Sequence, residues 1–166
     1  MEKLIFVLEK LVAGVGKATS WISVLLVFII VADVFMRYTF GITSSASFEI
    51  EWHLFGTLFL LGAGWTLQED KHVRVDVFYQ KFSKKTQAWV NLVGTVVLLM
   101  PLCCVVVIES LQFSITSFQI NEVSPDPGGL PARFIVKSMI PAGFLILGMQ
   151  GIAIILRSIK DLLGND

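Results

Sequence analysis

The chain has 166 residues, of which 55% are hydrophobic and 16% are charged. Soluble domains contain about 45–50% apolar and about 25% charged residues, so this composition, with a mean hydropathy of +0.77, indicates an integral membrane protein. The formal net charge of +0 gives no electrostatic support to a nucleic-acid partner.

Four apolar blocks predict an all-α fold with four transmembrane helices. Each block is long enough to cross about 30 Å of hydrocarbon at about 1.5 Å per residue. The blocks cover residues 20–36, 48–67, 88–108 and 134–156. We expect them to form one transmembrane domain over residues 18–157, followed by a cytoplasmic tail at 158–166.

The distribution of Lys and Arg predicts that both termini are cytoplasmic. With four spans, most basic residues fall on the side that holds the N-terminal segment, the loop at 68–87 and the C-terminal tail. The opposite side holds only Arg37, Arg133 and Lys137. Because cytoplasmic loops carry the excess of basic residues, we expect loops 38–47 and 109–133 to face outward.

Two segments have the pattern of amphipathic helices at the inner membrane surface. Residues 1–17 carry apolar side chains at helical spacing, with the charged side chains largely off that stripe. A plain cytoplasmic extension of the first span is the alternative for this segment. In the inner loop, Val75, Phe78 and Phe82 repeat at helical spacing, and the next residue, Ser83, is placed to cap the third span.

One ionisable residue lies inside the first span, close to its outer end. Asp33 precedes Arg37 by four residues, so the two side chains share a helix face and predict an ion pair. An ionisable group within a span is by default a candidate functional residue. The nearby membrane interface and the local partner favour a structural pair over a transport carboxylate.

The second span has a face of small residues that suits close helix packing. The residues on this face are Glu49, His53, Gly56, Leu60, Ala63 and Gly64. Docking onto another protein and packing against the chain's own spans both explain the face. We expect the other face, which includes Leu61 and Trp65, to meet lipid, with Trp65 near the inner interface.

The polar start of the second span does not predict a metal or catalytic site. Its residues are Glu49, Glu51, Trp52 and His53. Glu51 lies well round the helix from Glu49 and His53, and the sequence places no further ligand cluster on the outer side. Carboxylates are stabilised at a helix N-terminus, so we interpret them as anchors or salt-bridge partners and expect no cofactor.

Prolines predict irregular points in the second half of the chain. Pro101 and Pro141 are expected to kink the third and fourth spans. Between these spans, residues 121–131 read NEVSPDPGGLP, which excludes a regular helix and predicts a stiff outer loop of defined shape. Pro131 also suits the start of the fourth helix.

Three pieces of the chain together carry a family resemblance. They are MRYTF with the acidic stretch at 49–52, LGAGWTLQEDKHVRVDVFYQKFS, and SPDPGGLPARFIVKSMIPAGF. In order and spacing, over roughly residues 33–156, they resemble the small membrane subunit of TRAP transporters, the DctQ-like family. None of the pieces is a catalytic fingerprint.

This resemblance implies one component of a tripartite, sodium-driven importer of organic acids in the bacterial cytoplasmic (inner) membrane. A periplasmic binding protein would capture the substrate, and a large elevator-type membrane subunit would hold the sodium and substrate sites. The small subunit would be a scaffold that carries neither site and is not an enzyme. It would be embedded among lipids and bound stably to the large subunit.

Two surfaces follow from this reading as hypotheses. The large subunit is expected to contact the second span through Glu49, Trp52, His53, Gly56, Ala63 and Gly64. The binding protein is expected to touch the outer loop transiently, because that loop is stiff and faces outward. Its residues are Pro125, Asp126, Pro127, Gly128 and Gly129.

Two other classes of protein compete with this interpretation. A haem- or quinone-binding anchor of a respiratory complex is disfavoured because His53 and His72 would be about 28 Å apart along a helix and cannot share one haem. A stand-alone small transporter would need a carboxylate near the bilayer centre, and Asp33 lies too close to the end of its span.

Overall fold

The computed structural model describes residues 1–69, 79 and 82–164, and their regular structure is entirely helical. The elements are α1 (Glu2–Phe40), α2 (Ser45–Gln68), α4 (Lys84–Gly94), the π-helical turn η1 (Thr95–Leu99), α5 (Met100–Gln119) and α6 (Phe134–Leu163). The helix expected in the inner loop falls mainly on residues 70–78 and 80–81, outside the described part. The all-α prediction is therefore confirmed for the residues described.

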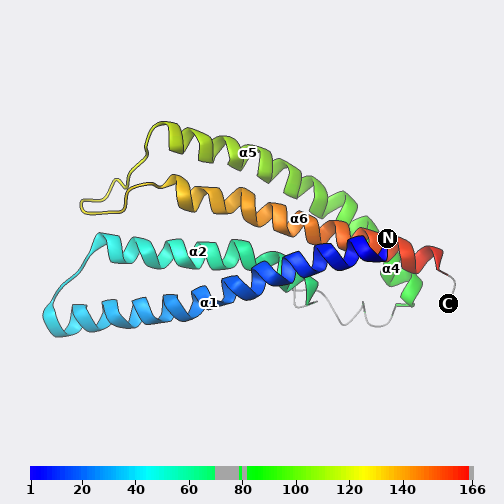
Figure 1. Cartoon of the computed structure of the whole chain (residues 1–166), viewed down its shortest axis with the longest axis horizontal. Coiled ribbons are helices and arrows are strands. Elements are labelled where there is room, and N and C mark those ends of the chain that lie inside the picture. The colour runs from blue at the N-terminus through cyan, green and yellow to red at the C-terminus, as the bar shows by residue number, and fades with distance from the viewer. Residues whose placement is uncertain (70–78, 80–81, 165–166) are drawn as a thin grey trace.

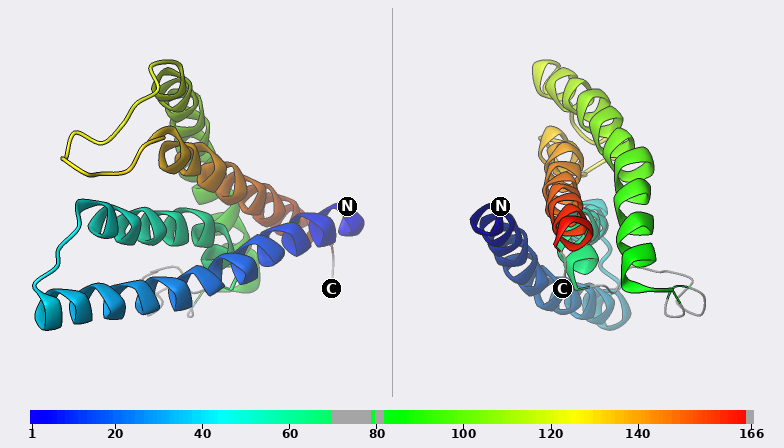
Figure 2. Two further views of the ribbon diagram at one scale, coloured as in Figure 1. Left: turned by 60° about the vertical axis from the view of Figure 1, so that its left-hand side comes forward. Right: turned by 90° about the vertical axis from the view of Figure 1, so that its right-hand side faces the viewer.

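The long helices form an up-and-down bundle (Figure 1). Each long helix runs opposite to the one before it, so the start of α1 and the end of α6 lie at the same end of the molecule. We call this the terminal end, and the end with the loops at 41–44 and 120–133 the loop end. Seen from two further directions in Figure 2, α1 and α5 are the outer helices of the bundle and diverge toward the loop end.

Among the described residues, three helices are long and apolar enough to cross a membrane. They are Glu2–Phe40, Phe134–Leu163 and the continuous stretch Lys84–Gln119. The polar start of α2 and its glycines lower its mean hydropathy, so α2 is not among them. Its 24 residues make a helix about 36 Å long, and α2 packs between α1 and α6. A count of four spans therefore remains our expectation.

The N-terminal segment is not an element of its own. Residues 2–40 form one uninterrupted helix, since no proline or loop separates residues 1–17 from the first span. Val12 is fully buried and Ile5 is 8% exposed, so this part of α1 packs against the bundle. The two expected arrangements were a separate helix on the membrane surface and an extension of the first span. The helix is continuous, as in the second arrangement.

Two ion pairs also join the N-terminal part of α1 to the end of α6. Glu9 accepts a hydrogen bond of 2.5 Å from Arg157, and Glu2 accepts one of 2.6 Å from Lys160. Both pairs are partly exposed to solvent, so they add less than the buried apolar contacts to the stability of this packing.

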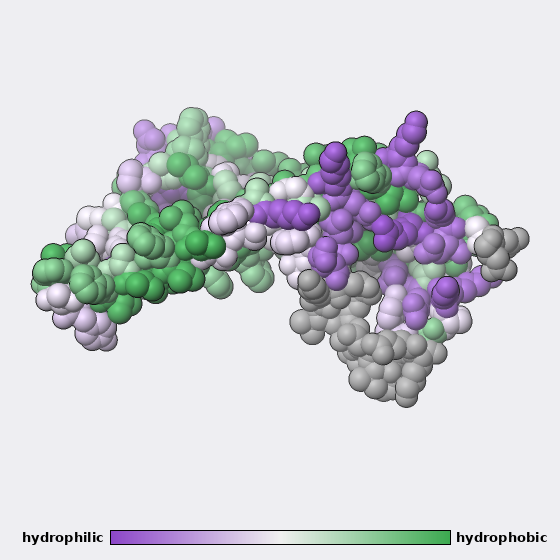
Figure 3. Space-filling view, turned by 60° about the horizontal axis from the view of Figure 1, so that its bottom comes forward, coloured by the Kyte–Doolittle hydropathy of each residue, from purple (hydrophilic) through white to green (hydrophobic). Residues whose placement is uncertain are grey.

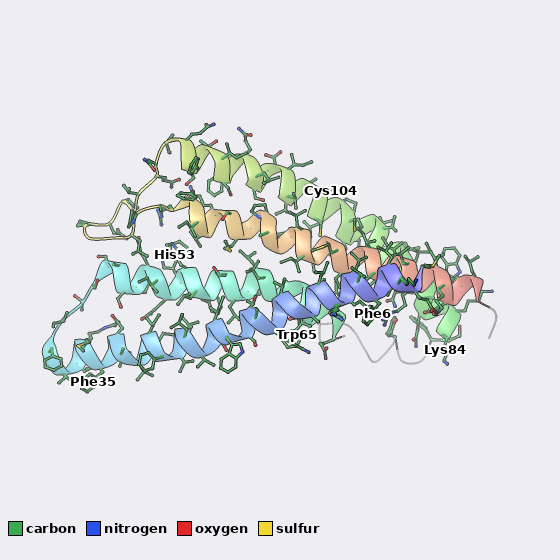
Figure 4. All side chains as sticks on the ribbon, viewed as in Figure 1. Phe6, Phe35, His53, Trp65, Lys84 and Cys104 are labelled. Atoms are coloured by element: carbon green, nitrogen blue, oxygen red, sulfur yellow. The ribbon has the colours of Figure 1, made fainter. Side chains whose placement is uncertain are left out.

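Close backbone contacts set the register of the central helices. A Cβ placed on Gly143 of α6 would lie 2.7 Å from the carbonyl oxygen of Leu60, and one placed on Gly64 would lie 2.9 Å from Ile146. α2 and α6 therefore run side by side in the same direction at glycine-mediated contact. On the other side of α2, a Cβ on Gly16 would lie 2.3 Å from Trp65, where α1 crosses α2 in Figure 4.

The contact between Trp65 and Gly16 corrects one expectation. Trp65 packs against α1 and does not simply face lipid. Helical periodicity showed that Trp65 lies on a different face from Gly64, but not that a long N-terminal helix would cover that face.

The third long helix contains a local defect next to a proline. α4, η1 and α5 are continuous, and the amide of Met100 donates to the carbonyl of Thr95 in the π turn. This irregular turn ends two residues before Pro101, whose ring lacks an N–H. Ser83 caps the start of α4 by accepting a hydrogen bond of 3.2 Å from the amide of Thr86, as the sequence predicts.

The surface divides into a mainly apolar and a mainly polar part (Figure 3). The half toward the loop end is largely hydrophobic, and the hydrophilic side chains gather toward the terminal end. The boundary lies near the level at which α2 ends, while α1, α4 and α6 continue beyond it. From Lys17 to Arg37, α1 covers about 30 Å, which matches the hydrocarbon core of a bilayer.

Candidate functional site

The most connected polar group at the loop end is the carboxylate of Glu49. Glu49 as a whole is only 2% exposed. One carboxylate oxygen accepts a hydrogen bond from the hydroxyl of Ser124, and the other accepts one of 2.7 Å from the backbone amide of Leu130. Glu49 therefore fastens the loop at 120–133 onto the first turns of α2.

The loop also holds its own shape. Ser124 donates its amide to the carbonyl of Leu130 at 3.0 Å, and Gly129 donates its amide to the carbonyl of Asp126 at 3.0 Å. The amide of Asp126 bonds the Ser124 hydroxyl at 3.1 Å, and Gly128 adopts a φ of 76° that favours glycine. The defined shape that its proline and glycine content predicts is thus present.

The exposed tip of this loop is short. Pro125, Asp126, Pro127 and Gly128 are exposed, while Gly129 is half-buried. A Cβ on Gly129 would come within 2.5 Å of both side-chain atoms of Ser124. The four exposed residues are therefore the part of the predicted loop surface that is available to a second protein.

Basic residues at the start of α6 surround the base of the loop. Lys137 pairs with Glu122 and lies 3.8 Å from the centre of the Phe113 ring. Arg133 lies 5.7 Å from the centre of the Trp52 ring, within cation–π range. The hydrogen bond from Lys137 holds the pKa of the Glu122 carboxyl below its ordinary value of 4.5.

Two residues of the predicted partner face are used inside the chain. Glu49 holds the loop, and Gly64 is buried against Ile146 of α6. His53 and Ala63 are half-buried, and Figure 4 shows His53 near the loop end of α2. These placements agree with the alternative that this face packs partly against the chain's own spans.

The exposed face of α2 contains Trp52, which the sequence analysis selected, and three phenylalanines, which it did not. Phe48, Trp52, Phe55 and Phe59 follow each other at helical spacing and are 65%, 39%, 60% and 70% exposed. Among the described residues, no atom beyond its chain neighbours and the nearby backbone of α2 lies within 4 Å of a Cβ placed on Gly56, so the surface beside the aromatic rings is open. We call these five residues the α2 aromatic face. A search for aromatic residues at spacings of three and four would have found it.

At the loop end of α1, Arg37 donates a hydrogen bond to the carboxylate of Asp33, as expected for this spacing. The Asp33 side chain is 8% exposed and that of Arg37 is 48% exposed. Asp33 is therefore a paired carboxylate.

Within the described ranges, no three His, Cys, Asp or Glu side chains lie close enough to hold a metal ion. The polar groups at the loop end instead form hydrogen bonds and ion pairs that join α2, the loop and α6. The described residues thus form long helices in up-and-down order, one loop held by a buried carboxylate, and an exposed aromatic face.

Comparison with known families identifies the chain. The model of the DctQ component of tripartite ATP-independent periplasmic transporters matches residues 26–161. The chain belongs to the DctQ family. The match runs from Leu26 in α1 to Asp161 in the last turn of α6 and includes the loop held by Glu49.

The DctQ family is the small component of TRAP transporters, which works with a large membrane subunit and a substrate-binding protein. The chain is therefore a component of an inner-membrane transporter family and not of an enzyme family. No curated protein and no solved structure matches it significantly.

Proposed function

We propose that this DctQ chain is a stationary scaffold in a sodium-coupled importer of an organic acid. In this proposal it spans the membrane four times with both termini in the cytoplasm, and the substrate and sodium sites lie in the large subunit. The observation that carries the proposal is the engagement of Glu49, whose two carboxylate oxygens hold a loop. A buried carboxylate used in this way maintains shape and does not bind a transported ion.

The large subunit is proposed to bind the α2 aromatic face. Aromatic side chains are enriched at protein interfaces because they bury a large area with few rotatable bonds. Gly56 adds an open position at which a neighbouring helix can approach closely. Of the residues predicted from sequence to form this interface, Trp52 and Gly56 belong to the α2 aromatic face. Glu49 and Gly64 instead make contacts within the chain, with the outer loop and with α6.

Copurification of the two membrane subunits tests this interface. Gly56→Leu and the double variant Phe55→Ala/Phe59→Ala should each reduce the amount of large subunit recovered with the tagged chain. Val105, which is 60% exposed on α5, offers Val105→Ala as a control that should leave recovery unchanged. Full recovery with both α2 variants would exclude this face. Gly64→Leu is unsuitable, because it would disturb the packing of α2 on α6.

The binding protein is proposed to touch the exposed tip of the outer loop. Asp126 is the one charged residue at this tip, and its side chain can be changed without removing the backbone hydrogen bonds of the turn. Asp126→Lys should lower uptake when the binding protein is limiting and restore it when the binding protein is in excess. Uptake that is equal to wild type at every concentration would exclude the contact.

The sodium and substrate assignments are tested with the purified components. Proteoliposomes with both membrane subunits should import an organic acid only with the binding protein and an inward sodium gradient. The small chain alone should neither transport nor bind that acid. Sodium-independent uptake, or uptake by the small chain alone, would contradict the proposal.

A further inference from the structure

The N-terminal part of α1 extends past the end of α2 and is fixed to α6. α1 passes the last turn of α2 at Gly16, which packs against Trp65. Beyond this point Ile5 is buried, and two ion pairs join Glu2 and Glu9 to the end of α6. Because α6 crosses the membrane in the proposed arrangement, this part of α1 is held along the direction of that span and not flat on the membrane surface.

A line of exposed residues runs along the outer side of α1. They repeat at alternating spacings of three and four residues, which is the heptad pattern by which one helix packs along another. The line, which we call the α1 seam, consists of Leu4, Val7, Leu11, Gly14, Ala18, Trp21 and Leu25. Its two small residues allow a second helix to approach closely. Among the described residues, no atom beyond its chain neighbours and the nearby backbone of α1 lies within 4 Å of a Cβ placed on Gly14.

The α1 seam lies partly inside and partly outside the hydrocarbon core. With Lys17 at the edge of this core, Leu4 stands about 20 Å further along the helix. The headgroup layer on each side of a bilayer is only about 5–8 Å thick. Acyl chains therefore cover Trp21 but do not reach Leu4 and Val7, which are 53% and 50% exposed. Exposed apolar residues at this height favour contact with another protein.

Three lysines follow one edge of the α1 seam at the heptad interval. Lys3, Lys10 and Lys17 are exposed, and each stands one position before a seam residue. Within the described residues, none of these lysines has an ion pair, whereas Glu2 and Glu9 on the neighbouring side of α1 pair with α6. A row of unpaired ammonium groups beside an apolar line favours a partner helix that carries carboxylates at the same interval.

Neither a second copy of this chain nor a lipid headgroup supplies these carboxylates. Two copies in one membrane run parallel, and in parallel packing each of the lysines faces the residue five positions further on in the other copy. Those residues are Leu8, Val15 and Ile22, which are apolar. Anionic headgroups reach Lys17 at the edge of the core, but Lys3 stands about 21 Å beyond it.

We infer that the α1 seam binds a membrane-spanning helix of the large subunit that continues into the aqueous phase at the terminal end. Carboxylates about every two turns on this helix pair with Lys3 and Lys10. The seam runs without a break from water into hydrocarbon, so its partner has to do the same. The inference rests on the proposed function, in which the large subunit is the stable partner, and adds a second contact to that of the α2 aromatic face.

Zero-length cross-linking of the purified complex of both membrane subunits tests the inference. A water-soluble carbodiimide joins a lysine ammonium to a carboxylate only where the two groups are in contact, and mass spectrometry of the peptides identifies each pair. We expect Lys3 and Lys10 to be joined to Asp or Glu residues of one helix of the large subunit. Lys84 and Lys85, which are exposed at the start of α4, are the reference lysines and should form few such links.

Charge reversal on the same lysines gives a second readout. Lys3→Glu/Lys10→Glu should lower the recovery of the large subunit with the tagged chain about fivefold at low salt, because two ion pairs become repulsive. Lys84→Glu/Lys85→Glu makes the same change in charge and should leave recovery unchanged. Ile5 and Val12 remain in place, and the variants are compared at equal helix content.

Three results would overturn the inference: cross-links from Lys3 and Lys10 that are no more frequent than those from the reference lysines, cross-links that join two copies of this chain, or equal recovery with both double variants. A wild-type complex that gives any of these results leaves the scaffold proposal intact. A wild-type chain that recovers no large subunit would overturn both.

Discussion

Glu49 and Leu130 are 81 residues apart in the chain and are joined by a hydrogen bond of 2.7 Å. The acceptor is a carboxylate at the start of α2, and the donor is a backbone amide at the far side of the outer loop. The loop connects α5 to α6, whereas Glu49 belongs to α2. This bond and the one from Ser124 therefore make the position of the loop depend on a helix that the loop does not connect.

Replacing Glu49 should release the loop while leaving the helices folded. In Glu49→Ala the amide of Leu130 loses a charged acceptor, so its hydrogen exchange should be about tenfold faster or more. Hydrogen exchange with mass spectrometry over peptides 122–133 measures this change. Glu109→Ala, at an exposed carboxylate on α5, is the matched control. Unchanged protection of the loop in Glu49→Ala would show that Glu49 does not hold it.

The close approach of α2 and α6 should make two glycines behave in opposite ways. In Gly143→Ala the new methyl group would meet the Leu60 carbonyl at 2.7 Å, and overpacking of this kind costs about 1–3 kcal/mol. Gly56 has no neighbour within 4 Å, so Gly56→Ala should gain about 0.5–1 kcal/mol from helix propensity. Denaturation of the purified chain in micelles measures both. Equal effects of the two substitutions would refute this packing.

The pairing of Glu122 with Lys137 should make the loop sensitive to acid. The folded chain lowers the pKa of Glu122 below 4.5, so the unfolded state binds the proton more readily. The stabilisation is complete above pH 4.5 and is lost as the pH falls through the lowered value. Lys137→Gln should therefore have a lower melting temperature than wild type at pH 7, and this difference should be smaller at pH 3. A difference that persists at pH 3 would mean that Lys137 acts through its contact with Phe113.

The N-terminal part of α1 should be held by packing more than by charge. Val12 is 0% exposed, and Val12→Ala should cost about 1–3 kcal/mol, as for other truncations of buried aliphatic side chains. Glu9→Gln removes a partly exposed ion pair with Arg157 and should cost clearly less. Melting temperatures at low and high salt separate the two effects, because salt screens only the second. A larger loss for Glu9→Gln would invert this ranking.

Local features of this chain were predictable from sequence, and distant pairings were not. Ser83 as a helix cap, the stiff loop at 121–131 and the pair of Asp33 with Arg37 each depend on residues close in the chain. The partners of Glu49 and Trp65 lie on segments far away in sequence. Helical periodicity shows which residues share a face but not which helix covers it, so the face containing Gly64 could be read either as an interface or as internal packing.

The N-terminal boundary differed from expectation for a related reason. An amphipathic stripe at residues 1–17 suits a membrane surface and suits a helix groove equally well. The first turns of α1 find a helix to pack against because α6 extends to Leu163, well beyond the end of the predicted span at residue 156. The length of α6 therefore decided how the first turns of α1 pack.

The distribution of buried residues along α1 has a thermodynamic consequence. After Leu26 no apolar residue of this helix is buried within the described part of the chain, although the helix continues to Phe40. Its apolar side chains there would be covered by acyl chains or detergent in both the folded and the unfolded states. Unfolding of this segment should therefore expose little new apolar surface to water, and the heat-capacity change on denaturation should be smaller than for a soluble domain of equal length.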